Sequence, residues 1–157
     1  MPKVGRQYSQ GKVNRWFIMY IIINYSLNMI LTPNGFLKVG GIVLLVLGIL
    51  GFILPGGRVL GDAFYLDFAE NVAHTVLGIV ALIAAYAISQ GAQKGLVLIV
   101  GIVALVFAVW GFLVAGNAAP NWYGIANLEN PLDNLLHLAV GIWAVWAASR
   151  KSSVMAM

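Results

Sequence analysis

The two histidines of this 157-residue chain occur in nearly the same local sequence, each four residues after a carboxylate. Glu70 precedes His74, and Asp133 precedes His137, a spacing that places acid and imidazole on the same face of a helix. Imidazoles and carboxylates bind divalent metal ions and exchange protons, and they are costly inside an apolar segment. The four side chains therefore predict a metal or proton site if they converge.

Two further interpretations of His74 and His137 are open. A glycine follows each histidine by four residues, at Gly78 and Gly141, and would leave room for a tetrapyrrole bound to the imidazole. Alternatively, the acids cap the helix starts, and a neutral imidazole donates a hydrogen bond to a carbonyl of a neighbouring helix. We expect this structural role without a cofactor, and keep a tetrapyrrole or a divalent metal as the alternative ligands.

The elements that must position these groups are membrane helices. Hydrophobic residues make up 61% of the chain and charged residues 9%, whereas soluble domains have about 25% charged residues. The sequence has no cysteine, which excludes disulfides and thiolate metal sites. It also lacks the basic face with polar or aromatic readers that nucleic-acid binding requires. Lipid is therefore the expected solvent of this chain.

Four apolar runs are long enough to cross about 30 Å of hydrocarbon at about 1.5 Å per residue. They lie near residues 37–54, 68–89, 95–115 and 132–149. Gln90, with the glycine that follows it, marks the expected end of the second run. The pattern predicts an all-α integral membrane protein with a four-helix transmembrane bundle.

The placement of charge predicts the orientation of the bundle. With four spans, both termini and the loop between the second and third spans lie on one side. The basic residues of that side are Lys3, Arg6, Lys12, Arg15, Lys38, Lys94, Arg150 and Lys151. The opposite side has Arg58 and all five acids of the chain. The excess of Lys and Arg predicts that both termini are cytoplasmic.

The segment 16–31 is apolar but short, and Asn24, Ser26 and Asn28 interrupt it. If it crossed the membrane, the basic residues would divide five against four, and the charge bias would vanish. We therefore expect an interfacial or partner-facing helix at the cytoplasmic surface, with its basic flank beside anionic headgroups.

The four spans form a tandem repeat of two helices. Residues 41–56 match 101–116 at eight of sixteen positions, and the second helices align at an offset of 63. Because a two-helix unit returns the chain to the same side, the copies are parallel, unlike the inverted repeats of many transporters. The chain divides into an N-terminal region, two repeats and a tail, at 1–36, 37–90, 91–149 and 150–157.

Small and polar residues recur at steps of four and three in the second and fourth spans, which forms one stripe along each helix. The stripe contains Asn71, Gly78, Ala81 and Ala85 in one span and Asn134, Gly141, Ala144 and Ala148 in the other. Small side chains let membrane helices approach closely. We therefore predict that the stripe is the packing surface between helices.

At these residues the chain resembles a family of small four-span prokaryotic membrane proteins of unknown function. The resemblance rests on Asn-x-x-His-x-x-x-Gly in both halves and on Gly48, Gly51 and Phe52, and it covers about residues 37–149. It implies a multi-pass protein of the prokaryotic cytoplasmic, or inner, membrane. The family has no assigned activity, so the resemblance implies a fold and no reaction.

Three functions are compatible with the sequence. The leading hypothesis is a non-catalytic accessory subunit that packs against lipid and other membrane proteins through its spans and the segment 16–31. The alternative is a subunit that binds a tetrapyrrole or a metal through His74 and His137. A small transporter is third, because the spans lack the broken helices and midplane charges of transport sites. No motif indicates an enzyme.

Overall fold

A computed structural model of the protein describes residues 14–62, 64–118, 120–124, 127–128 and 130–150. The helices are α1 (Arg15–Ile30), α2 (Pro33–Ile53), α3 (Phe68–Ala87), α4 (Gln90–Leu113) and α5 (Leu132–Ser149). A 3-10 turn, η1 (Pro55–Gly57), and a short strand, β1 (Val59–Asp62), lie between α2 and α3. The basic N-terminus, most of the predicted tail and the side chain of Asn28 lie outside the described residues.

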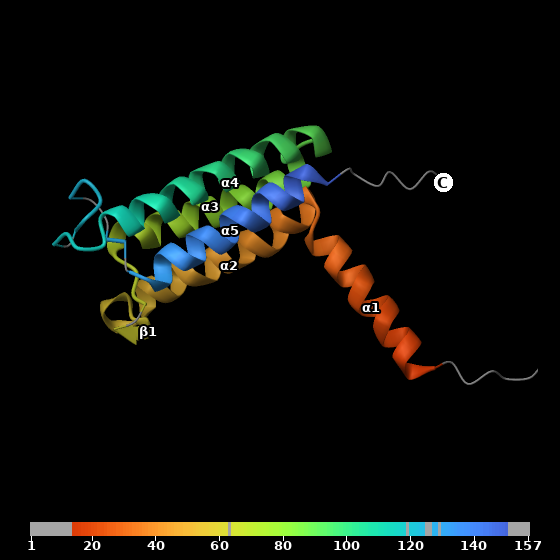
Figure 1. Ribbon diagram of the computed structural model, residues 1–157, viewed down its shortest axis with the longest axis horizontal. Coiled ribbons are helices and arrows are strands. Elements are labelled where there is room, and N and C mark those ends of the chain that lie inside the picture. The colour runs from red at the N-terminus through yellow and green to blue at the C-terminus, as the bar shows by residue number, and fades with distance from the viewer. Residues whose placement is uncertain (1–13, 63, 119, 125–126, 129, 151–157) are drawn as a thin grey trace, which may run out of the picture.

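Four of the helices, α2 to α5, are long and apolar enough to cross a membrane, and they pack into a bundle (Figure 1). This confirms the predicted all-α, four-span fold. The 16-residue helix α1 is not among the four. It leaves the bundle at the start of α2 and points away from it (Figure 1).

Two helices begin earlier than predicted because a side chain caps each of them. α2 begins at Pro33 rather than near 37, and Thr32 accepts a hydrogen bond from the N–H three residues later at 3.0 Å. α4 begins at Gln90 rather than near 95, and Ser89 makes the equivalent bond at 3.4 Å. The prediction that Gln90 ends the second span is therefore wrong, since this residue starts α4.

Each repeat forms a closely packed helical hairpin, α2 with α3 and α4 with α5. Gly78 of α3 lies against α2, and a Cβ on Gly78 would lie 2.9 Å from the carbonyl oxygen of Gly41. The equivalent Gly141 of α5 lies against α4, where its Cβ would lie 3.1 Å from the carbonyl oxygen of Gly101. Because glycines stand at both crossings, the helix backbones approach closely.

The predicted stripe lies on the packed faces of α3 and α5. In α3, Asn71, Gly78 and Ala85 are buried, and Ala81 is partly buried. In α5, the buried members are Asn134, Gly141, Ala144 and Ala148. The repeat in the sequence thus corresponds to a repeat of helix contacts.

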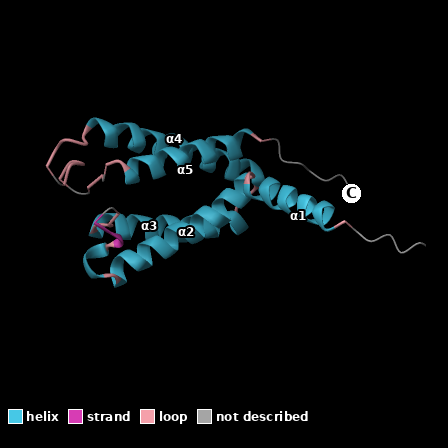
Figure 2. Ribbon diagram, turned by 60° about the horizontal axis from the view of Figure 1, so that its bottom comes forward, coloured by secondary structure: helices cyan, strands magenta, loops and turns pink. Residues whose placement is uncertain are grey.

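A buried apolar cluster joins the two hairpins at one end of the bundle, which we call the basic end because Lys38, Lys94 and Arg150 lie near it. The cluster consists of Phe36, Leu37, Ala84, Ala85, Val97, Ala144, Ala147 and Ala148. Figure 2 shows the hairpins diverging from this end toward the opposite one, where the α2–α3 and α4–α5 loops lie. We call the opposite end the acidic end, because Asp67, Glu70 and Asp133 lie there at the starts of α3 and α5.

Candidate functional site at the acidic end

Both histidine signatures lie at the acidic end, where α3 and α5 begin. His74 is in the second turn of α3, and His137 is in the second turn of α5. The Asp67 carboxylate at the start of α3 accepts a hydrogen bond from the Asn127 N–H of the α4–α5 loop at 2.9 Å. The fold therefore brings the two signatures to the same region of the molecule.

The first signature is built into the start of α3 as a capping box. The Asp67 carboxylate accepts a hydrogen bond from the Glu70 N–H at 2.9 Å, and the Glu70 carboxylate accepts one from the Asp67 N–H at 2.8 Å. This reciprocal pair satisfies N–H groups that a helix start leaves unpaired. Within the described part of the chain, Nδ1 of His74 is buried and has no hydrogen-bond partner. Glu70 thus holds the helix start, and Nδ1 of His74 is left without a carboxylate.

The second signature pairs the acid with the imidazole. Nδ1 of His137 lies 3.1 Å from the Asp133 carboxylate and 3.0 Å from the Asp133 carbonyl oxygen. Because both oxygens are acceptors, Nδ1 carries a proton, and when the ring is neutral Nε2 carries a lone pair. Asp133 is 4% exposed, and its second carboxylate oxygen has no hydrogen-bond partner among the residues that the structure describes.

The difference between the two signatures follows from where each helix begins relative to its acid. Asp67 caps α3 with its side chain, whereas Pro131 caps α5 without a side-chain hydrogen bond. Glu70 is the third residue of α3, the position from which an acid completes a capping box, whereas Asp133 is the second residue of α5. The Asp133 side chain turns toward His137 instead.

The asparagine of each signature is a packing residue. Asn71 and Asn134 are 4% and 0% exposed. Their Oδ1 atoms occupy the space that a Cβ would take on Gly51 of α2 and on Gly111 of α4. Contacts between an oxygen and a glycine Cα–H recur where helices cross closely and act as weak hydrogen bonds. Each asparagine therefore fixes the register of the two helices in its hairpin.

The structure does not gather the four predicted ligands into one metal site. Asp133 pairs with His137, whereas Glu70 caps α3 and His74 lies on the other hairpin. Across the described residues, no group of three or more His, Cys, Asp or Glu side chains is placed to hold a metal ion. A metal ion bound here would have at most the two histidines of this set as ligands, with Asp133 holding the His137 ring.

The room expected beside each histidine for a tetrapyrrole is filled by the partner helix. The side chain of Leu105 packs onto Gly141, and the backbone of Leu45 packs onto Gly78. Both glycines serve the close approach of helices, which is the packing role predicted for the stripe. The glycine faces therefore offer no flat surface for a macrocycle.

Four aromatic side chains at the acidic end make a chain of ring contacts that reaches His137. We call Phe107, Trp110, Trp122 and Tyr123 the aromatic cluster. Phe107 stacks on His137 at 5.5 Å between centroids, and Trp122 lies 5.3 Å from Phe107. Tyr123 lies 5.8 Å from Trp122 and 6.0 Å from Trp110. The three-residue spacing of Phe107 and Trp110 on α4 is the sequence signal that could have indicated this cluster.

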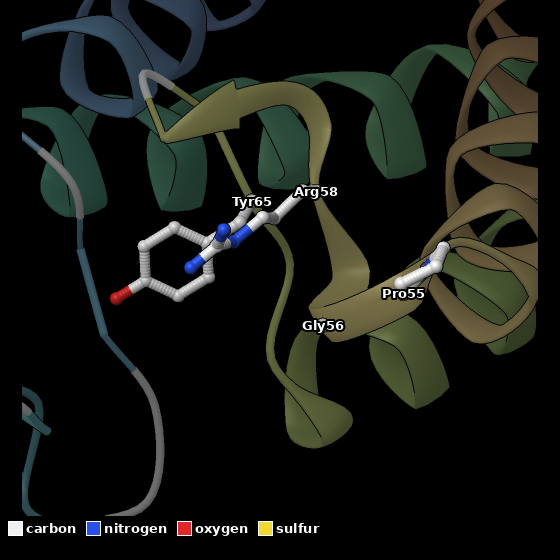
Figure 3. Close-up of a pocket in the computed structure, with 4 residues that line it drawn as sticks. All are labelled: Pro55, Gly56, Arg58 and Tyr65. Atoms are coloured by element: carbon white, nitrogen blue, oxygen red, sulfur yellow. The ribbon is translucent and has the colours of Figure 1, made fainter.

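A pocket of about 530 Å³ also opens at the acidic end, lined by Pro55, Gly56, Arg58 and Tyr65. Figure 3 shows the Arg58 guanidinium beside the Tyr65 ring, and the two residues pair across an antiparallel bridge. The Tyr65 hydroxyl accepts a hydrogen bond from the Asn127 amide at 3.0 Å, which joins the pocket to the α4–α5 loop. A guanidinium at the pocket wall attracts anionic or polar groups.

A polar contact at the basic end was not predicted from the sequence. The buried Gln93 amide donates to the carbonyls of Ala85 and Ile88 at 3.1 and 3.2 Å. Asn34 of α2 donates to the Ala85 carbonyl at 2.6 Å and to Gln93 at 3.3 Å. These bonds satisfy carbonyls at the end of α3 and join the two hairpins. Sequence analysis placed Gln93 in a loop, so no helical pattern indicated it.

Comparisons with protein-family models, with curated proteins and with solved structures gave no match for this chain. The site is therefore interpreted from its own geometry. Its polar groups mainly cap helices and hold them in register, and one imidazole, that of His137, is oriented by a buried carboxylate.

Proposed function

We propose that this chain is a non-catalytic accessory subunit of a larger membrane assembly, packed against lipid and other membrane proteins. We place it in the cytoplasmic membrane of a prokaryote with both termini in the cytoplasm, an orientation that the excess of Lys and Arg at the basic end supports. The observation that carries the proposal is the exposure of α1.

The first half of helix α1 is apolar and exposed around its whole circumference. The eight consecutive residues from Trp16 to Ile23 are each at least 43% exposed, and eight residues make more than two helical turns. A helix that lies on a membrane surface has a polar face toward water, and α1 has none over this stretch. At about 1.5 Å per residue its length is about 24 Å, short of the roughly 30 Å hydrocarbon core. A groove in a partner protein would cover such a helix on all sides.

The direction of α1 is fixed by contacts with the bundle. The Thr32 hydroxyl donates to the Met29 carbonyl at 2.8 Å, and the Trp143 indole of α5 donates to the Ile30 carbonyl at 3.3 Å. Phe36 packs edge-on against the Trp143 ring at 4.6 Å. A helix presented at a set angle loses less conformational entropy on docking than a flexible tail does.

The polar groups at the acidic end support a non-catalytic role. The carboxylates of Asp67 and Glu70 cap α3, and Asp133 pairs with His137. Asn71 and Asn134 pack against glycines of the facing helices. These residues thus have assignments within helix starts and helix contacts that need no substrate.

Site-specific photo-crosslinking in native membranes tests the proposal. A photoreactive amino acid replaces Tyr20 of α1, which is 65% exposed, or Ile99 of α4, which is 61% exposed. We expect one discrete protein adduct from Tyr20, identified by mass spectrometry, and mainly lipid adducts from Ile99. Lipid adducts alone at both positions would contradict the proposed docking role of α1.

A cofactor-binding subunit is a second candidate, and the geometry of His137 favours it. An imidazole whose Nδ1–H is held by a carboxylate presents Nε2 in the way that metal-ligating histidines do. The test compares the absorption spectrum and metal content of gently purified protein with those of a His74→Ala/His137→Ala variant. A stoichiometric pigment or metal that the variant loses would establish this function, whereas a colourless, metal-free protein would rule it out.

A further inference from the structure

An apolar groove of about 350 Å³ runs along one face of α4 and is lined by Ile102, Leu105, Val106, Val109 and Trp110. Leu105 leans onto Gly141 of α5 and forms the inner wall. Ile102, Val106 and Val109 are 52%, 59% and 60% exposed, so the groove opens outward from the bundle. Its volume lies within the range of about 300–1,000 Å³ that small-molecule sites occupy.

The length and position of the groove match one leaflet of a bilayer. From Ile102 to Trp110 it extends about 12 Å at 1.5 Å per residue, close to the roughly 15 Å that half of a hydrocarbon core measures. Trp110 lies one turn before the end of α4 at Leu113. The groove therefore begins near the middle of the span and ends where headgroups begin.

The headgroup end of the groove is aromatic. The Trp110 ring is nearly parallel to the Tyr123 ring, at 6.0 Å between centroids and 12° between planes. Tyr123 is 76% exposed and has a φ of 49°, a left-handed conformation that non-glycine residues seldom adopt. This strained backbone holds an exposed ring against the end of the groove.

The charge around this end selects among headgroups. The described residues at this end of the bundle include four acids, Asp62, Asp67, Glu70 and Asp133, and one basic residue, Arg58. Such a surface repels anionic lipids and attracts cations. Aromatic rings bind ammonium groups through their faces.

We propose that the α4 groove binds one acyl chain of a lipid in the leaflet at the acidic end, with an ammonium headgroup against Trp110 and Tyr123. The site lies at the end of the bundle opposite to α1 and does not depend on the accessory role proposed above. The acyl chain of the lipid contacts the branched side chains of the groove, and its ammonium group contacts the rings of Trp110 and Tyr123.

The internal repeat supplies a matched control for this proposal. At an offset of 60, Ile102, Leu105 and Val106 correspond to Ile42, Leu45 and Val46 of α2, so the two faces share their apolar character. The position of Trp110 is occupied by Leu50 in α2, which has no aromatic ring. Val46 and Val106 are both exposed, at 49% and 59%.

The experiment uses the full chain in vesicles of equimolar phosphatidylethanolamine and phosphatidylglycerol, followed by gentle release and native mass spectrometry. We expect one retained phosphatidylethanolamine per chain, preferred about two- to fivefold over phosphatidylglycerol, which is the size of one exposed cation–π contact. The Val106→Phe variant, which fills the groove, should lose the retained lipid. The Val46→Phe variant should keep it.

A second variant separates the contribution of the lipid headgroup from that of the acyl chain. Trp110→Leu reproduces the residue of the first repeat and should abolish the preference for phosphatidylethanolamine while one lipid is still retained. Equal loss of lipid in Val46→Phe and Val106→Phe, or equal retention of both lipids by the wild type, would overturn the site. The melting temperature and elution volume of each variant show whether it is folded.

Discussion

In the first half of the molecule, the carboxylate that precedes the histidine turns back to its own helix start, and in the second half it turns forward to the histidine. Glu70 accepts from the Asp67 N–H, whereas Asp133 pairs with Nδ1 of His137. The spacing of acid and histidine is the same in both halves, so spacing alone does not select the partner. The start of the helix does, because Glu70 is the third residue of α3, the position of the acid in a capping box, whereas Asp133 is the second residue of α5.

The two halves agree in their helix contacts where they disagree in their hydrogen bonds. Asn71 packs on Gly51 in the first hairpin, and Asn134 packs on Gly111 in the second. The packing contact is therefore common to both copies, and the pairing of carboxylate with imidazole belongs to the second copy. Substitutions at equivalent positions can test this division.

The largest effect should come from adding a methyl group at the shared contact. In Gly51→Ala and Gly111→Ala, the new Cβ would occupy the space of the Asn71 or Asn134 carboxamide oxygen. We expect each to lower the free energy of unfolding by about 3 kcal/mol, the upper part of the range for overpacking. The measurement is a denaturant titration in mixed micelles.

The control is Gly95→Ala, since a Cβ on Gly95 would meet nothing within 4 Å. It should leave stability unchanged or raise it by up to about 1 kcal/mol, as alanine is the better helix former. The free-energy costs of Gly51→Ala and Gly111→Ala should be similar. If these two costs differed from each other by as much as either differs from that of Gly95→Ala, the packing contact would not be common to the two halves.

The second-largest effect on stability should differ between the two halves of the molecule. Asp133→Asn removes the charged partner of His137 and should cost about 2 kcal/mol, typical of a hydrogen bond to a charged group. Glu70→Gln should change stability by less than about 0.5 kcal/mol, because glutamine also completes a capping box. Equal costs for the two substitutions would mean that Glu70 supports His74 in the way that Asp133 supports His137. Nitrogen NMR of the histidines should show the Nδ1–H tautomer of His137 in the wild type.

The sequence predicted the packing within each repeat well because that packing is periodic along one helix. The four- and three-residue steps from Asn71 to Ala85 place small residues on one face, and the second copy repeats the pattern. The start of α4 was predicted five residues late, because Ser89 caps the helix and the Gln93 side chain donates hydrogen bonds to carbonyls at the end of α3. A tertiary partner of this kind leaves no periodic signal.

The partners of the candidate site were harder to predict. A four-residue spacing shows that a carboxylate can reach a histidine, but not that the helix start competes for the same carboxylate, as it does for Glu70. The direction of α1 depends on a hydrogen bond between Trp143 and Ile30, which are 113 residues apart in the chain. Neither the length nor the composition of α1 contains that information.

A smaller difference between the halves is expected at the helix caps. Asp67 accepts N–H groups from Glu70 and from Asn127, both at 2.9 Å, so Asp67→Ala should cost about 1 kcal/mol, the usual value for an N-cap. Asn130 is the equivalent residue, is exposed, and accepts from the Asn134 amide at 3.3 Å. Asn130→Ala should cost less than half as much in the same titration. A larger cost at Asn130 would indicate that it caps α5 in place of Pro131.

The smallest effect should have the opposite sign. The Thr75 hydroxyl is buried against Gly48 and has no hydrogen-bond partner within the described chain, and the second half has Leu138 at the equivalent position. Since an unpaired buried hydroxyl is unfavourable, Thr75→Val should raise the free energy of unfolding by about 0.5–1 kcal/mol. Thr32→Val is the matched control, because that hydroxyl donates to the Met29 carbonyl and accepts from the α2 start, and its loss should cost about 1 kcal/mol. If both substitutions destabilised the protein equally, Thr75 would have a partner of its own, and the first half would contain a hydrogen bond for which the second half has no counterpart.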